Sequence, residues 1–69
     1  MLTDREAEVL EVSPVQIHGV PYVDLTIRYP EGVVASARLG RESIPVDLRV
    51  GERVMVQAAM SVIVAVRRP

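Results

Sequence analysis

The stretch Tyr22-Val-Asp-Leu-Thr-Ile-Arg-Tyr29 decides the fold class of this chain. Apolar and polar residues alternate along it with a period of two, which is the period of a strand with one buried face. The apolar face would carry Val23, Leu25, Ile27 and Tyr29. The sequence therefore predicts a half-buried β-strand over residues 22–29.

A hairpin is predicted directly after this strand. Pro30-Glu31-Gly32 is a turn sequence, because proline pre-sets its own φ and glycine accepts a positive φ. The next strand would run from Val33 to Leu39. We expect its inner face to carry Val33, Ala35, Ala37 and Leu39.

Two interpretations stay open for the residues that precede the predicted strand over residues 22–29. Alternation breaks within Ala7 to Ser13, which favours a strand with a β-bulge. Thr3 and Glu6 have the spacing of a capping box, so a short helix over residues 4–12 is the alternative. Two prolines and Gly19 predict a connector over residues 14–21.

The C-terminal half is predicted to add a connector and two more strands. Residues 40–50 read as a connector with a short helix or 3-10 turn, and its apolar residues would cover the end of the sheet: Ile44, Val46 and Leu48. The fourth strand begins near Gly51, and its inner residues would be Val54, Val56 and Ala58. The fifth, Val62 to Arg67, is apolar on both faces and needs cover on both.

Composition agrees with one all-β domain spanning residues 1–69. Valine dominates, Phe, Trp and Cys are absent, and nine acids oppose eight bases, so the net charge is −1. Disulfides and thiolate metal sites are thereby excluded, and no basic field favours nucleic acid. No apolar run approaches the roughly 20 residues of a membrane helix. We expect a cytoplasmic protein with no membrane insertion.

Self-association is expected because the chain is small. A 69-residue domain buries only about 60% of its unfolded surface and is marginal alone. The two-faced fifth strand would leave apolar surface uncovered on a monomer. We therefore predict a homo-oligomer that forms through Val62, Ile63 and Val64.

The order of these segments resembles the TOBE and Mop family of small barrels. The resemblance rests on Ala-x-Val-x-x-Val from residue 7, Gly32-Val-Val-Ala-Ser-Ala-Arg-Leu39, Val-Gly-Glu-Arg-Val-Met-Val from residue 50, and Ser-Val-Ile-Val-Ala-Val from residue 61. It implies a five-stranded antiparallel OB-like barrel. Such barrels occur as regulatory parts of ABC import ATPases and as free-standing oxyanion-binding proteins, so an ABC-type ATPase is an implied partner.

The chain departs from the molybdate-binding members of that family. Ala58 stands where those members carry lysine, and Met60 stands where they carry serine. A tetrahedral dianion requires converging cationic or N–H donors. Residues 22–39 therefore fit the barrels attached to sugar and polyamine import ATPases better.

One cluster of polar residues is a candidate ligand site. Arg38, Arg41 and Ser43 flank Gly40, and two guanidinium groups with a hydroxyl could converge on an anion. Ser61 is a weaker candidate, because a turn residue already has a structural reason to be serine. The alternative is a solvated loop in which Arg41 pairs with Glu42 or Asp47.

Catalysis is not expected. His18 is the only histidine and falls in the connector, without a thiol or second imidazole to share a metal. We predict a non-catalytic module without cofactor or metal that binds a small anionic or polar solute, an anion or a sugar. The alternatives are an OB-fold protein for single-stranded nucleic acid, disfavoured because Tyr22 and Tyr29 lie on opposite faces, and a purely structural oligomer.

Overall fold

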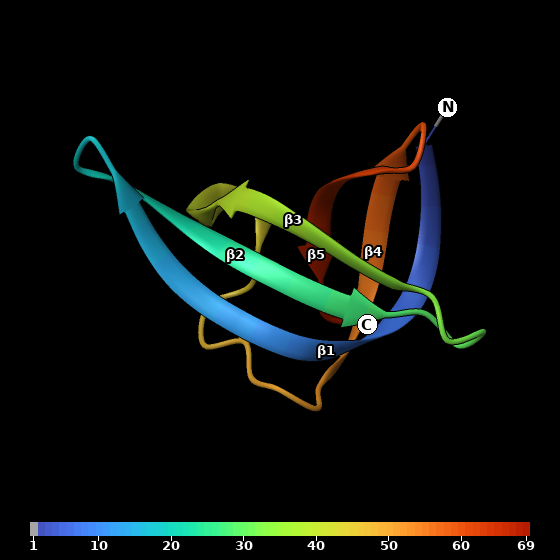
Figure 1. Ribbon diagram of the computed structural model, residues 1–69. Coiled ribbons are helices and arrows are strands. Elements are labelled where there is room, and N and C mark those ends of the chain that lie inside the picture. Colours follow the sequence, from blue (N-terminus) through green and yellow to red (C-terminus); the bar gives the residue numbers. More distant parts are fainter. Residues whose placement is uncertain (1) are drawn as a thin grey trace.

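The computed structural model describes residues 2–69 as one five-stranded antiparallel sheet with a single 3-10 turn (Figure 1). The elements are β1 (Leu2–Ile17), β2 (Val20–Arg28), β3 (Val34–Gly40), η1 (Arg41–Ser43), β4 (Arg53–Ala59) and β5 (Val62–Arg67). The all-β class and the short turn within residues 40–50 are confirmed. Within the described part of the chain, no helix has the length and apolarity that a bilayer crossing requires.

Strand β1 organises the sheet because it pairs with two different neighbours. Its first half, Leu2 to Glu8, pairs with β4, and its second half, Glu8 to Ile17, pairs with β2. The register shifts between Val9 and Glu11, where a bulge bends the strand. The predicted bulged strand is thus confirmed and the helix over residues 4–12 is wrong, because long-range ladder bonds outweigh the local capping signal.

The predicted connector over residues 14–21 is also wrong. Both strands continue through it to a two-residue turn, His18-Gly19, with φ of 50° and 78°. Positive φ at both positions is the type I′ geometry that matches strand twist. Pro14 and Pro21 are tolerated because β4 pairs only with the first half of β1, and β3 pairs with β2 only beyond Pro21.

The turn between β2 and β3 forms as the sequence predicts. The Gly32 N–H donates to the Tyr29 carbonyl at 2.9 Å, and the Tyr29 N–H donates to the Val33 carbonyl at 2.8 Å. Gly32 has a φ of 96°, the left-handed conformation that closes a three-residue hairpin loop. Val33 lies between the loop and β3 and is 54% exposed, so it is not buried as the prediction of an inner position implied.

The core lies on the concave face of the curled sheet. Its most buried side chains are Val9, Leu25, Ile27, Val54 and Val56. The inner faces predicted for the second and fourth strands are confirmed except at Val23, which is half-buried and lies outside the core. Of the connector residues, Leu48 is buried and Ile44 packs against the core, whereas Val46 is 74% exposed and does not cover it.

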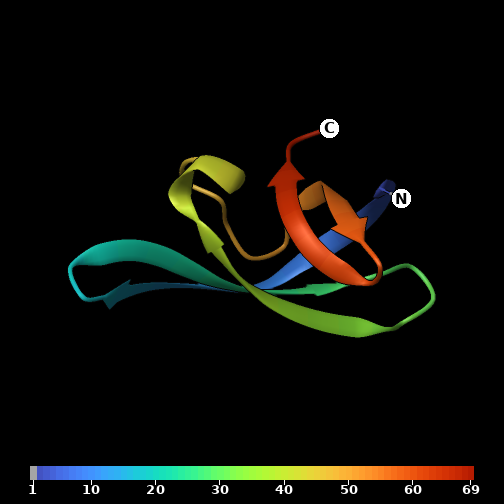
Figure 2. The ribbon, with the colours of Figure 1, turned by 90° about the horizontal axis from the view of Figure 1, so that it is seen from above.

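Strands β3 and β5 form the two edges of the sheet. Seen from above, β4 and β5 rise over the layer made by β2, β3 and the second half of β1 (Figure 2). The edges approach each other, but no ladder pairs join them among residues 2–69. The sheet is therefore open, and the OB-like barrel stays a prediction.

Strand β5 has the bounds that the sequence predicts. A register shift in its ladder with β4, at Gln57 and Ala58, changes which of its side chains face the core. Ile63 and Val66 point into the core of their own chain, with 7% and 5% of their surface exposed. Val62 and Val64 are 63% and 38% exposed. Of the three residues expected to mediate self-association, only these two present an apolar surface.

Candidate functional site

The four predicted ligand residues do not converge. Arg38 lies opposite Asp24 in the β2–β3 ladder. Its Nε and Nη2 donate to the two carboxylate oxygens of Asp24 at 2.7 and 2.9 Å. This hydrogen-bonded pair holds the pKa of the Asp24 carboxyl below its ordinary value. The guanidinium fork of Arg38 is therefore occupied by a cross-strand partner.

Arg41 occupies the 3-10 turn and borders a cavity of about 430 Å³. We call this space the hairpin–loop cavity, because its walls are the β1–β2 hairpin and the loop between β3 and β4. Arg41 forms no ion pair with any residue in 2–69, so the predicted pairing with Glu42 or Asp47 is wrong. Ser43 is half-buried in the same turn and does not line the cavity.

The walls of the hairpin–loop cavity are mainly apolar. The hairpin contributes Val12, Pro14, Val15, Gln16, Pro21, Tyr22 and Val23, and the loop contributes Ile44, Pro45, Val46, Asp47 and Leu48. Among residues 2–69, Asp47 is the only charged group there besides Arg41, and its φ is 57°. The cavity can thus contact an apolar body and present one cation and one acceptor to polar groups.

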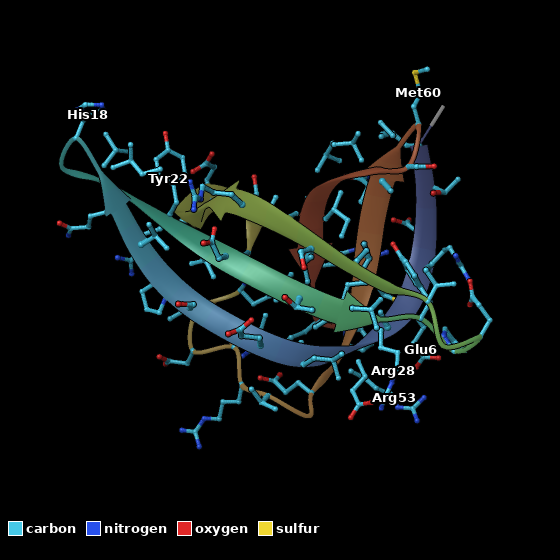
Figure 3. The ribbon with its side chains drawn as sticks, in the orientation of Figure 1. Glu6, His18, Tyr22, Arg28, Arg53 and Met60 are labelled. Carbon is cyan, nitrogen blue, oxygen red and sulfur yellow. The ribbon has the colours of Figure 1, made fainter. Side chains whose placement is uncertain are left out.

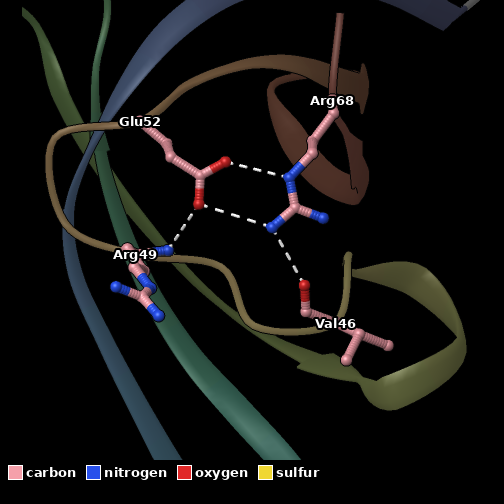
Figure 4. A network of polar contacts seen from close by, with 4 residues as sticks. All are labelled: Val46, Arg49, Glu52 and Arg68. Atoms are coloured by element: carbon pink, nitrogen blue, oxygen red, sulfur yellow. Dashed lines mark hydrogen bonds and ion pairs between the residues drawn. The ribbon is translucent and has the colours of Figure 1, made fainter.

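A hydrogen-bonded network holds the loop that forms one wall (Figure 4). The Arg68 Nε donates to a Glu52 carboxylate oxygen at 2.9 Å, and its Nη2 donates to the Val46 carbonyl at 2.9 Å. The Arg49 backbone N–H donates to Glu52 at 2.7 Å. The hydrogen bonds from Arg68 and Arg49 lower the pKa of Glu52. One carboxylate and one guanidinium therefore fix the loop.

Ser61 lies in a second cavity of about 470 Å³, which we call the turn-end cavity. Its walls are Thr3, Arg5, Tyr29, Val33, Ala35, Ala58, Met60 and Ser61. Met60 and Ser61 form the β4–β5 turn with φ of 50° and 69°. None of these residues borders the hairpin–loop cavity. Ser61 therefore cannot act with Arg41 on one small ligand.

Sequence reasoning missed Arg5, which also lines the turn-end cavity. Its guanidinium carbon lies 4.2 Å from the centroid of the Tyr29 ring, and its Nη2 donates to both carboxylate oxygens of Glu31 at 2.6 and 2.7 Å. Arg5 is two residues before buried Ala7 in β1, so extending the alternation of that strand towards the N-terminus would have placed it on the inner face.

A third hollow, of about 280 Å³, lies beside the β2–β3 turn and holds paired charges (Figure 3). Arg28 donates to Glu8 at 2.6 Å, and Arg53 donates to Glu6 at 3.2 Å. Both pairs are exposed, and each positive charge there has a negative partner. This hollow therefore offers no free charge to a ligand.

His18 stands at the tip of the β1–β2 hairpin, away from the cavities (Figure 3). Among residues 2–69 no three His, Cys, Asp or Glu side chains are grouped to hold a metal ion. Arg41 and Arg5 each line one of the two larger cavities described above. Comparisons with protein-family models, with curated proteins and with solved structures found no match.

Proposed function

We propose that the protein is a non-catalytic module that binds a small acidic or polar solute in the hairpin–loop cavity. The observation that carries the proposal is the position of Arg41, a cation without an ion-pair partner among residues 2–69, at the border of a mainly apolar space. Of the four residues predicted as ligands, Arg41 alone keeps that role. Arg38, Ser43 and Ser61 are outside this cavity.

The chemistry of the walls favours a carboxylate-bearing solute with an apolar part. A guanidinium binds a carboxylate through two parallel N–H donors, and this charge-assisted contact is stronger where water is partly excluded. The apolar walls would contact the remainder of the solute, and the Asp47 carboxylate would accept a hydroxyl hydrogen bond. A sugar acid has the carboxylate and the hydroxyl groups, and its C–H groups would contact the apolar walls, so it is the solute type that we favour.

A regulatory role belongs to the same proposal. The strand order and the bent β1 support a five-stranded OB-like barrel of the TOBE and Mop type, in which β3 and β5 would come together. A barrel of that type would act on an ABC-type import ATPase. The solute would then stabilise one state of the assembly by mass action.

The test is a titration of the protein with gluconate, acetate, sulfate, molybdate and glucose. Backbone amide shifts in the NMR spectrum locate binding, and thermal shift ranks the solutes. Arg41→Gln is expected to weaken gluconate binding at least tenfold. Arg49→Gln is the matched control, because Arg49 also lacks an ion pair among residues 2–69 and does not line the cavity.

Two results would contradict this function. Equal gluconate binding by the Arg41 and Arg49 variants would show that Arg41 is not the ligand. A response to short oligonucleotides alone, falling steeply with salt, would replace solute binding by the nucleic-acid alternative.

Self-association is a second candidate function, favoured by the exposed valines of β5. Val62 and Val64 lie on β5, whose outer edge has no partner strand among residues 2–69. Light scattering of the protein at high micromolar concentration would show an oligomer, and Val64→Glu would give a monomer. Val20→Glu, at the tip of the β1–β2 hairpin, is the control. A monomeric parent protein would contradict this candidate.

A further inference from the structure

Arg5 lies beside buried apolar residues on the concave face of the sheet. In the β1–β4 ladder it is paired with Val56, and the next pair on the same face is Ala7 with Val54. These three neighbours are buried, with 3% or less of their surface exposed. Arg5 instead keeps 46% of its side chain exposed. A charged group at such a position often marks a site that the fold alone does not require.

The guanidinium of Arg5 is held in one orientation. Tyr29, itself 9% exposed, covers one of its faces at 4.2 Å, and Glu31 binds its Nη2. Its Nε and Nη1 form no hydrogen bond with residues 2–69. The Nε and Nη1 donors are therefore not engaged by the described residues, and Arg5 lines the turn-end cavity.

The other walls of the turn-end cavity suit a flat ring. Ala35 and Ala58 are small and leave room beside the guanidinium, and Val33 and Met60 add apolar surface. Two hydroxyl groups, from Thr3 and Ser61, border the same space. The Thr3 hydroxyl donates to the Ala58 carbonyl at 3.4 Å. Hydroxyl groups donate or accept, so they can bond to either type of ring substituent.

The charges around the turn-end cavity disfavour an anion. Arg5 is paired with Glu31, and among residues 2–69 no other group that is charged at neutral pH lines the space. A phosphate would meet the Glu31 carboxylate beside Arg5. An uncharged ring would instead stack on the face of the guanidinium opposite Tyr29, with its edge atoms bonded to the Thr3 and Ser61 hydroxyl groups.

We propose that the turn-end cavity binds an uncharged planar heterocycle of the nucleobase type, stacked on the guanidinium of Arg5 that Tyr29 and Glu31 hold in place. The site shares no residue with the hairpin–loop cavity and does not depend on the function proposed there. The ring could come from a free nucleoside or from an unpaired base of a single strand.

The experiment is an NMR titration of the full chain with adenosine. Ring currents should shift the Arg5 Nε–H signal and the amides of Ala35 and Ser61, and leave those of the β1–β2 hairpin unchanged. Arg5→Lys retains the charge but loses the plane, and is expected to weaken binding at least tenfold. Arg67→Lys is the matched control, because Arg67 has only a 3.5 Å contact with Asp4.

A second variant keeps the proposal testable if Arg5→Lys does not fold. Ala35→Leu would fill the cavity while leaving Arg5 in place, and should abolish the adenosine shifts. Inorganic phosphate should produce none. An adenine trinucleotide that binds more tightly than adenosine, and still depends on Arg5, would identify a single strand as the source of the ring.

The proposal is wrong under any of three results. The first is that adenosine at 10 mM shifts none of the NMR signals around the turn-end cavity. The second is that the Arg5→Lys variant binds adenosine as tightly as the parent protein does. The third is that ribose alone produces the same NMR shifts as adenosine.

Discussion

The two ends of the sheet have the same regular ladder and very different packing. The core end, which comprises β4, β5, residues 2–12 of β1 and residues 23–28 of β2, contains the five described side chains that have less than 2% of their surface exposed. The arm, residues 13–22 of the β1–β2 hairpin, has cross-strand partners up to its turn but no buried residue. The presence of ladder pairs in a region therefore does not show how much that region contributes to the stability of the fold. The burial of apolar side chains does show it, because an isolated hairpin is only marginally stable in water.

The largest expected loss of stability comes from a substitution in the core end. Ile27→Ala removes a side chain that is 0% exposed and leaves a cavity, so it should lower the free energy of unfolding by about 2–5 kcal/mol. Val20→Ala in the arm should change it by less than about 0.5 kcal/mol. Urea denaturation followed by circular dichroism measures both. Similar losses for the two variants would refute the contrast.

Substitutions in the β4–β5 turn and in the β1–β2 turn should have smaller effects on the free energy of unfolding, with opposite signs. Ser61 has a φ of 69°, which costs about 1–2 kcal/mol for a residue with a Cβ. Ser61→Gly should therefore stabilise the protein by about 0.5 kcal/mol after the entropy cost of glycine. Gly19 has a φ of 78° and open space around it, so Gly19→Ala should destabilise through backbone strain alone. Thermal melts of both variants would show whether the signs differ.

The smallest expected effect concerns the acid dependence of the core end. Hydrogen bonds lower the folded-state pKa of Glu52 and Glu31 below the ordinary value of 4.5. A lowered pKa gives stability that is present above pH 4.5 and is lost as the pH falls through the folded-state value. Arg68→Gln should flatten this loss for Glu52 and raise its pKa towards 4.5. Carboxyl NMR titration checks this, and an unchanged Glu52 pKa in the variant would contradict it.

The sequence predicted the core end well because its signals are periodic. Alternation in β2 and β4 placed Leu25, Ile27, Val54 and Val56 on the buried face, where the structure has them. The arm differs from the predicted connector because Pro14 and Pro21 lie where the hairpin has a ladder on one side only, so neither proline interrupts its strand. Whether a ladder lies on both sides depends on the tertiary fold, which local composition does not contain.

The candidate site was predictable only in part. Arg41 lies in a turn directly after Gly40, and the sequence identifies it as an exposed polar residue. The engagement of Arg38 by Asp24 follows from the β2–β3 register, which the three-residue turn sets. The stacking of Arg5 on Tyr29 requires the bend of β1 at its bulge. A cross-strand register and a strand bend are both absent from a linear pattern.

The prolines of the arm have a consequence for behaviour at high concentration. A projecting hairpin with an uncovered edge would normally recruit strands from other molecules and seed fibrils. Pro14 and Pro21 each remove one backbone N–H donor from this hairpin. An incoming strand would meet gaps in the row of donors that it needs. The two prolines that make the arm resemble a connector in the sequence should therefore also prevent it from nucleating amyloid.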